Sequence, residues 1–346
     1  VATSPGQAKP IGVDKQVRLR LTRGPLLSTL YYNSIPTAAG ARGLWRTTVD
    51  NATPKLFRPA LTNPQDCVGC HVVSTNGKRI SVSYGYDIGG GVLDGTNGIK
   101  ALIGSNGARW SFSSFNPAGD QVLVTSAGKI FIVDSGTGQR IAEPSTMIAD
   151  LVGGAIDMAQ WSPDGQRVLF VRAPANSVAM GEQDQKRSAT GDLMLMGYSG
   201  GEFSLPTMLL AKGPTSYHMY PSYTDDGQYV LYNTAQEPCK NGNPCNTYAP
   251  DNTFLRIMKP VVGSPITDLK RAWQVALRGS NAPRSAPELV DGKYLFFSFH
   301  SRLPYGSTST SGPQVWLAAI DMDLLKQDPS QDPSWAPFWL PGQDTS

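Results

Sequence analysis

Short runs of alternating apolar and polar residues recur along the chain, each after a turn that ends in glycine. The segment "AQWSPDGQRVLFV", from Ala159, shows the unit: an apolar lead-in, a Pro-Asp-Gly turn and an alternating strand, which together predict a β-hairpin. The unit recurs from Val72, Ser113 and Pro221, and more loosely from Ala286. The turn glycines of the five units are Gly77, Gly119, Gly165, Gly227 and Gly292. Their spacing of 42 to 65 residues fits a four-stranded blade with insertions.

These repeats predict an all-β fold: a β-propeller of six blades, each a four-stranded antiparallel sheet. A third strand follows each hairpin, for example "KIFIVDS" and "QVWLAAID", and "STLYYNSI" with "GLWRTTVD" forms a partial blade near the N-terminus. We expect a single domain over residues 1–346, with about residues 1–25 as an extension or ring-closing strand and about residues 327–346 as an extended tail. The alternative is a β-sandwich whose turns are similar by chance.

The composition agrees with many short strands and excludes some classes of function. The 36 glycines and 27 prolines suit a chain with many turns. The net charge is only +3 and the 30 Lys and Arg residues form no basic run, so no nucleic-acid partner is expected. No stretch approaches the roughly 18 apolar residues of a membrane helix. The opening "VATSPGQAKP" lacks Met, which we interpret as a mature or trimmed end from which any secretory signal has been removed.

One motif carries recognisable chemistry: the pentapeptide C-x-x-C-H at Cys67, Cys70 and His71. Two cysteines at this spacing can each bind a vinyl group of a porphyrin while the adjacent imidazole binds the iron. We therefore expect one covalent haem c, with Cys67 and Cys70 as thioether anchors and His71 as the proximal iron ligand. The alternatives are a disulfide or redox C-x-x-C beside a chance histidine, or half of a zinc site. No second C-x-x-C supplies the other zinc ligands, and no thioredoxin-like βαβ pattern surrounds the motif.

The register of the repeat predicts where the pentapeptide lies. Cys70 stands seven residues before Gly77, as Met158 does before Gly165, so the pentapeptide is expected at the start of an innermost strand. We expect a haem-binding loop inserted before that strand, at the rim where the other innermost strands begin. Long loops between second and third strands should emerge on the same face and could cover the haem. Their tyrosines could stack on the porphyrin or be ordinary turn residues: Tyr84, Tyr86, Tyr248 and Tyr305.

The distal iron ligand has several candidates among two further histidines and nine methionines. Met158 is the first candidate, because it shares the register of Cys70. His218, nine residues before Gly227, is the alternative, and Met219, His300, another methionine or an open position remain. In the structural alternative, Met158 fills core beside the central channel and His218 is a surface or hydrogen-bonded loop residue. A methionine ligand would give the haem a higher potential than a histidine ligand.

Cys239 and Cys245 form a second cysteine pair, in the Gly- and Pro-rich loop "PCKNGNPC". We expect a local disulfide between them, with two surface thiols as the alternative. A disulfide and a c-type haem both belong outside the cytoplasm, so the two predictions together favour a periplasmic or extracellular location.

The turns, "WSPDGQRVLF" above all, resemble the PD-type repeat in the propeller of the periplasmic TolB protein, over most of the chain after Leu26. This resemblance implies the fold and says little about function. Four further segments are together similar to a group of secreted, cytochrome-like PD-repeat proteins of myxobacteria and their relatives: "DCVGCHVVSTNGKRIS", "FSFHSRLPYG", "GPQVWLAAID" and "DPSWAPFWLPGQD". That resemblance implies a c-type haem in a propeller and little further biochemistry.

These observations favour an electron-transfer protein over an enzyme. We expect a monohaem c-type cytochrome on a propeller scaffold, which exchanges electrons with a redox partner protein or within a multi-subunit complex. One alternative is a haem enzyme, such as a peroxidase or small-molecule reductase, which needs an open sixth position with an acid or base above it. The other is a binding or scaffold propeller with a structural haem. The chain contains no Ser-His-acid set, phosphate loop or calcium loop of known spacing.

Overall fold

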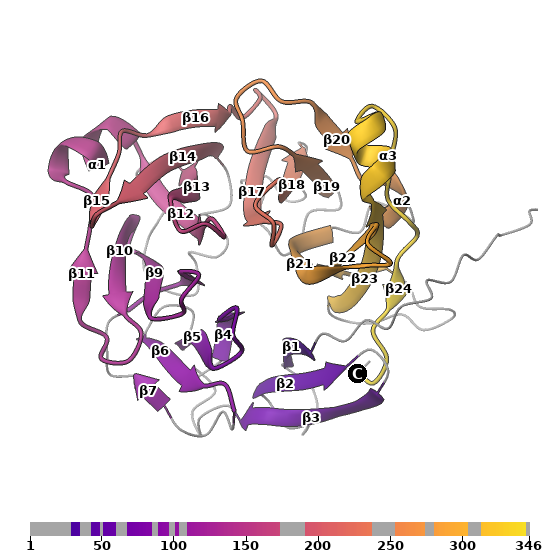
Figure 1. Ribbon diagram of the computed structural model, residues 1–346, viewed down its shortest axis with the longest axis horizontal. Helices are drawn as coiled ribbons and strands as arrows, with labels where there is room; N and C mark the ends of the chain where they lie inside the picture. Colours follow the sequence, from indigo (N-terminus) through magenta and orange to yellow (C-terminus); the bar gives the residue numbers. More distant parts are fainter. Residues whose placement is uncertain are drawn as a thin grey trace, which may run out of the picture.

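Six antiparallel sheets stand around a ring in the computed structural model of the chain, each sheet one blade of a propeller (Figure 1). The structure describes residues 29–34, 43–48, 51–59, 68–84, 89–96, 101–103, 109–173, 191–236, 253–273, 280–303 and 313–343. The predicted all-β propeller of six blades is confirmed. Two blades differ from the expected four strands, because three strands are described in blade 1 and five in blade 4.

The strands of the first three blades follow one another along the chain. Blade 1 contains β1 (Thr29–Ser34), β2 (Gly43–Thr48) and β3 (Asn51–Pro59). Blade 2 contains β4 (Val68–Val73), β5 (Arg79–Tyr84), β6 (Gly89–Asp94) and β7 (Ala101–Ile103). Blade 3 contains β8 (Phe112–Phe115), β9 (Gln121–Ser126), β10 (Lys129–Asp134) and β11 (Arg140–Ala142).

The last three blades continue this order and are joined by short helices. Blade 4 contains β12 (Ala155–Trp161), β13 (Arg167–Ala173), β14 (Asp192–Ser199), β15 (Glu202–Phe203) and β16 (Thr207–Leu210). Blade 5 contains β17 (Ser216–Tyr223), β18 (Val230–Gln236), β19 (Thr253–Met258) and β20 (Ile266–Asp268). Blade 6 contains β21 (Ser280–Val290), β22 (Tyr294–Ser301), β23 (Gln314–Asp321) and β24 (Phe338–Trp339). The helices found in the described ranges, α1 (Thr146–Val152), α2 (Lys270–Trp273) and α3 (Met322–Gln327), are all too short to cross a membrane.

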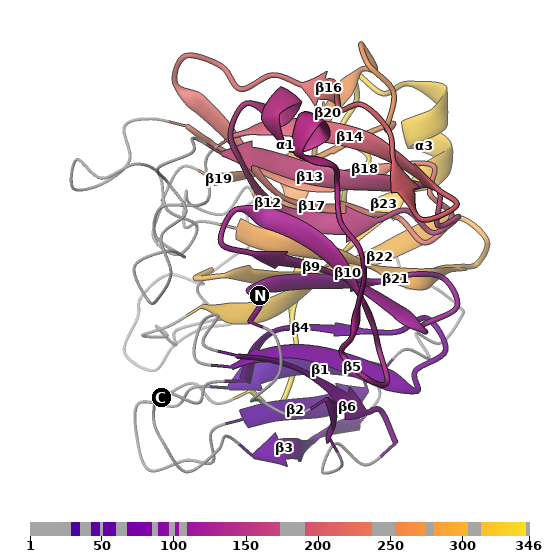
Figure 2. The ribbon, with the colours of Figure 1, turned by 90° about the vertical axis from the view of Figure 1, so that its left-hand side faces the viewer.

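The first strand of blades 2 to 6 lies nearest the centre of the ring, and the later strands lie progressively outward (Figure 1). This is the strand order that the repeat predicted. The inner strands, such as β4 and β17, run roughly along the axis of the ring, whereas outer strands such as β11 and β16 run across it (Figure 1 and Figure 2). Each of these first strands therefore begins at one face of the ring and brings its first residues to the centre of that face.

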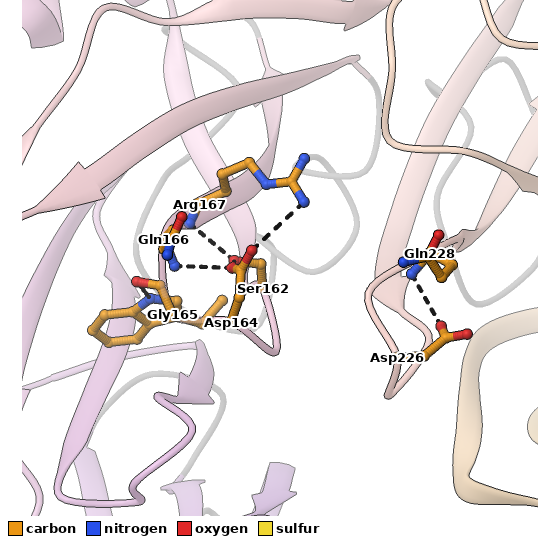
Figure 3. A network of polar contacts seen from close by, with 8 residues as sticks. Ser162, Asp164, Gly165, Gln166, Arg167, Asp226 and Gln228 are labelled. Carbon is orange, nitrogen blue, oxygen red and sulfur yellow. Dashed lines mark hydrogen bonds and ion pairs between the residues drawn. The ribbon is translucent and has the colours of Figure 1, made fainter.

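The glycine turns join first and second strands through a repeated set of hydrogen bonds. In the turn between β12 and β13, a carboxylate oxygen of Asp164 accepts from the backbone N–H of Gln166 at 3.0 Å and from the hydroxyl of Ser162. Asp226 plays the same part in the turn between β17 and β18 (Figure 3). Gly165 then has a φ of 72°, a conformation that side-chain-bearing residues rarely adopt. The Asp-Gly signals are thus turn chemistry, as predicted.

Clusters of buried apolar side chains hold the ring together, one between each pair of neighbouring blades. Between blades 4 and 5, for example, Met158 and Tyr232 belong to one cluster. Between blades 6 and 1, Tyr32 packs with Val315 and Leu317. Within the described ranges every blade takes its strands from one continuous segment of chain. Apolar packing between the first and last blades therefore closes the ring there.

The C-terminal segment forms the outer edge of blade 6. β24 pairs with β23, with Trp339 opposite Trp316. Beyond β24, the side chain of Gln343 accepts from the backbone N–H of Val315 at 2.7 Å and donates to its carbonyl at 2.8 Å. Residues 1–25 lie outside the described residues, so their expected role as an extension or ring-closing strand remains a prediction.

Candidate functional site

A β-bulge recurs near the start of the first strand in four of the six blades. The pairing register shifts after Gly69 in β4, Asp157 in β12, Met219 in β17 and Asn281 in β21. The next residue is left-handed in all four blades, with φ of 43° at Cys70, 50° at Met158, 49° at Tyr220 and 53° at Ala282. Such a backbone costs of order 1 kcal/mol for any residue other than glycine. Its repetition marks the bulge as a fixed feature of the fold that redirects the chain near the ring centre.

The bulges confirm the register predicted from the turn glycines. Cys70 and Met158 each stand seven residues before a turn glycine, and each is the first residue of a bulge. The described part of the pentapeptide begins at Val68 and belongs to β4 itself, so it is a bulged strand rather than a loop before the strand. Cys67 lies outside the described residues.

His71 follows Cys70 on the bulge and reaches blade 1. Its Nε2 lies 3.0 Å from the backbone carbonyl oxygen of Tyr31 in β1. Both Cys70 and His71 are half-buried. Burial is the main cause that lowers the pKa of His71, and a lowered pKa keeps the imidazole neutral near pH 7. Neutral imidazole is the form that binds a metal.

Blade 6 brings two basic side chains close to His71. Arg284 comes two residues after Ala282 at the bulge of β21, and His300 lies in β22 opposite Asn281. The charges of His71 and Arg284 both act on His300, and Arg284 also acts on His71. The three side chains are therefore electrostatically coupled, and they come from the first strand of blade 2 and the first two strands of blade 6. We call Cys70, His71, Arg284 and His300 the central cluster.

Arg284 has no acidic partner in the described part of the chain. Its Nη1 donates to the backbone carbonyl of Pro283 at 2.9 Å, and none of the ion pairs formed there includes Arg284. Desolvation lowers the pKa of Arg284, against smaller opposing effects of Tyr220 and Cys70. A partly desolvated guanidinium without a counter-charge is costly. Arg284 is therefore suited to bind a carboxylate or phosphate group.

His300 has an exposed side chain whose ring makes no hydrogen bond to any described residue. Surrounding protein still desolvates the ring enough to lower its pKa to about 4, and the positive charges of His71 and Arg284 add to this effect. His300 is thus neutral near pH 7, with its ring nitrogens uncommitted to described protein groups. No three His, Cys, Asp or Glu side chains come together as a metal site in the described ranges.

Met158, the first distal candidate, has the same left-handed backbone conformation as Cys70, but its side chain lies in a different environment. Its side chain is 2% exposed and packs with Leu169 and Val171 in the cluster between blades 4 and 5. Its Sδ accepts a hydrogen bond from the backbone N–H of Tyr220 at 3.2 Å. The structure therefore places Met158 in the core, with its sulfur occupied by the bulge of the next blade.

His218, the alternative distal candidate, is also buried, with 3% of its surface exposed. Its Nδ1 lies 3.0 Å from the hydroxyl of Thr234, and its Nε2 lies 3.1 Å from the carbonyl oxygen of Ala211. Burial lowers its pKa to about 4. Both ring nitrogens of His218 thus have protein partners, and the ring links β17 to β18 and to the segment after β16.

Two aromatic residues meet across the ring near the same level. Phe112 stands seven residues before Gly119, and Tyr220 seven before Gly227. Their ring centroids are 6.0 Å apart at an interplanar angle of 65°, although they belong to blades 3 and 5. First-strand residues of blades that are not neighbours therefore reach one another at the ring centre.

Several predicted site residues cannot be placed in this way. Cys239 and Cys245 lie outside the described residues, as do three of the loop tyrosines, so the disulfide remains a prediction. Tyr84 is described and is 3% exposed in the cluster between blades 1 and 2, so it is a core residue rather than a stacking surface. The pattern of the sequence missed Arg284 and named His300 only as one of the remaining distal candidates. No local motif marks either residue. Both belong to blade 6, which comes near blade 2 only because the ring closes, so the relation is not visible in neighbouring residues of the sequence.

Comparison with known proteins finds the fold and no close relative. No protein family and no curated protein sequence matches this chain. The structure of TolB from Acinetobacter baumannii is similar with a TM-score of 0.50 and 16% identity, over 90% of this chain and 66% of that one. The structure of a nidogen/laminin complex is similar with a TM-score of 0.50 and 11% identity, over 91% of this chain and 99% of that one. Both likenesses show the propeller fold alone.

Proposed function

We propose that the protein is a monohaem c-type cytochrome whose propeller forms the haem pocket and exchanges electrons with a partner protein. The observation that carries the proposal is the position of the C-x-x-C-H pentapeptide. Its described part forms the left-handed bulge of β4, where the charge of Arg284 acts on His71. The same position holds Met158, Tyr220 and Ala282 in the other bulged blades, so blade 2 alone of the four has a thiol there.

The residues present fit a haem of the c type. A porphyrin supplies four of the ligands of its iron, so a chain needs to supply only one or two, which agrees with the lack of a larger metal cluster in the described ranges. His71 would be the proximal ligand, and binding through Nε2 would require it to give up its contact with Tyr31. Arg284 would bind a propionate of the haem. The propionate would supply the carboxylate partner that Arg284 lacks among the described residues.

Attachment uses the chemistry of the two thiols. Cys67 and Cys70 would each add across a vinyl group: a sulfur–carbon bond forms, the thiol hydrogen moves to the neighbouring carbon, and no oxidant or reductant is consumed. When bound, the haem iron supplies one-electron oxidation and reduction. His71 would hold the haem through its iron, and Arg284 would tune the reduction potential through its charge.

The location and the partner follow from this chemistry. A c-type haem fits a periplasmic or extracellular protein, and the predicted disulfide between Cys239 and Cys245 fits the same compartments. A one-electron carrier passes its electron to another protein, so it needs a redox partner protein or a place in a multi-subunit complex.

Visible spectroscopy of the chain matured with haem tests the proposal. We expect the reduced protein to show the sharp bands of a c-type cytochrome and to keep its colour under denaturing electrophoresis. The variant with Cys67→Ser and Cys70→Ser should lose the bound colour and keep the β-sheet circular dichroism. The matched control, with Cys239→Ser and Cys245→Ser, should keep the haem. A wild-type chain that acquires no covalent haem under the same conditions would contradict the proposal.

A haem enzyme is the second candidate, because the central cluster has side chains that could serve an open iron. His300 has an exposed ring and Arg284 a charge without an acidic partner in the described part of the chain, as an acid–base group and an anion-binding group would. Carbon monoxide and cyanide separate the two functions. An enzyme with an open iron should bind both readily, whereas an electron carrier with six ligands should hardly respond.

A further inference from the structure

The sixth ligand of the iron must lie close to His71. The ligand also needs a donor atom that is not already used by the protein. These two conditions can be applied to each histidine and methionine considered as a distal ligand.

Met158 and Met219 do not meet these conditions. Met158 is buried between blades 4 and 5, and its sulfur accepts from the backbone of Tyr220. Met219 is fully buried in the same cluster. Either sulfur would have to leave the core before it could bind iron, which would cost several kcal/mol of packing.

His218 does not meet them either. Both of its nitrogens have partners, the hydroxyl of Thr234 and the carbonyl oxygen of Ala211. It is buried, and Arg256 and Asp192 are the charged groups that act on it, rather than any member of the central cluster. A ring that binds iron would give up at least one of these buried hydrogen bonds.

His300 is the candidate that fits these conditions best, because it lies next to the bulge of blade 6 and no hydrogen bond to a described residue occupies its ring. His300 lies in β22 opposite Asn281 of β21, which stands directly before the bulge of blade 6, and His71 belongs to the matching bulge of blade 2. His71 contacts Tyr31 of blade 1, the blade that separates blades 2 and 6 (Figure 1). The charge of His71 is among those that act on His300, and the side chain of His300 is exposed.

We propose that His300 is the distal iron ligand, so that the haem has two histidine ligands, one from blade 2 and one from blade 6. This inference rests on the proposed binding of haem c at Cys67, Cys70 and His71. Two histidines give a lower potential than histidine with methionine, and they leave no open position for small ligands. The protein would then be an electron carrier. Its haem would be held by one histidine from each of the two blades that neighbour blade 1.

Spectroscopy of the oxidised, haem-bearing protein tests the proposal. We expect the electron paramagnetic resonance and near-infrared magnetic circular dichroism of a low-spin iron with two imidazole ligands. His300→Ala should convert the iron to high spin and allow it to bind carbon monoxide after reduction, and added imidazole should restore the low-spin signal. His300→Met should replace the two-imidazole signature by that of a thioether ligand.

Met158→Leu and His218→Gln are the matched controls, and both should keep the two-imidazole signature. The proposal is overturned if the wild type shows a thioether signature, or if His300→Ala keeps the wild-type low-spin signal. These results concern the ligand alone, because they require covalent haem in every sample. A wild-type chain without covalent haem would instead overturn the proposed function, and the ligand with it.

Discussion

The bulges of blades 2 and 4 have the same backbone conformation, but the side chains on them are buried to different extents. Cys70 and Met158 have φ values of 43° and 50° at the same point of the first strand. Met158 is 2% exposed and the next residue, Ala159, is equally buried, whereas Cys70 and His71 are half-buried. Blade 4 therefore uses its bulge for packing, and blade 2 presents reactive groups on it. The fold determines where the backbone turns, and the side chains determine whether that place is core or site.

The largest expected difference between the two bulges is in stability. Met158→Ala should lower the free energy of unfolding by about 3 kcal/mol, because it leaves a cavity between blades 4 and 5. Met158→Leu should cost less than about 1.5 kcal/mol. Cys70→Ala in the haem-free protein should change the stability by less than about 1 kcal/mol, because the side chain is only half-buried. Urea unfolding measures all three, and equal losses for Met158→Ala and Cys70→Ala would break the comparison.

The buried histidine of blade 5 should make stability depend on pH. The pKa of His218 is about 4 in the folded chain, mainly through desolvation, against about 6.5 when unfolded. Between these values the unfolded chain binds a proton that the folded chain does not, so stability falls as the pH drops from about 6.5 to about 4. The loss should reach about 3 kcal/mol and level off below pH 4.

His218→Gln is the control, because it keeps a polar side chain that cannot ionise in this range. The difference in unfolding free energy between the wild type and this variant should follow the stated curve. Asp192 and Arg256 also face His218, so both must remain in the variant. A difference that does not vary with pH would mean that the fold does not hold His218 neutral. His218 would then remain a candidate for roles other than a buried structural histidine.

The charge of Arg284 should have a smaller effect, on the haem rather than on the fold. Arg284→Gln should lower the reduction potential by roughly 40 mV, which corresponds to about 1 kcal/mol for one electron. The loss of a positive charge favours the oxidised iron, which carries one more positive charge. Arg140→Gln is the control, because Arg140 forms an exposed pair with Glu143 on the outer strand of blade 3. Equal potentials for the wild type and Arg284→Gln would show that Arg284 does not face the haem.

The smallest expected effect concerns the backbone that the bulges share. Ala282→Gly should raise the free energy of unfolding by about 0.5 kcal/mol, because glycine relieves the cost of its φ of 53° and loses little packing. Ala159→Gly should lower it by about 1 kcal/mol, because Ala159 is buried and has no left-handed backbone. Thermal unfolding followed by circular dichroism measures both. A loss of stability with Ala282→Gly would show that the bulge is not strained.

The fold and half of the site could be predicted from local sequence. Turn glycines such as Gly165 mark hairpins because the Asp-Gly turn depends on neighbouring residues only, and their spacing also aligned Cys70 with Met158. The direction of the Met158 side chain could not be predicted, since its sulfur partner is the backbone of Tyr220 in another blade. Ala282 stands ten residues before its turn glycine instead of seven, so the offset that found the other bulges did not find the one beside Arg284.

The mass of one peptide from the mature wild-type protein tests the central claim most directly. The account predicts that the proteolytic fragment containing Cys67 and His71 carries the added mass of one haem and absorbs visible light. An unmodified fragment, or one with a disulfide between Cys67 and Cys70, from protein produced together with the haem-attachment machinery, would contradict the claim that blade 2 of this propeller carries a c-type haem.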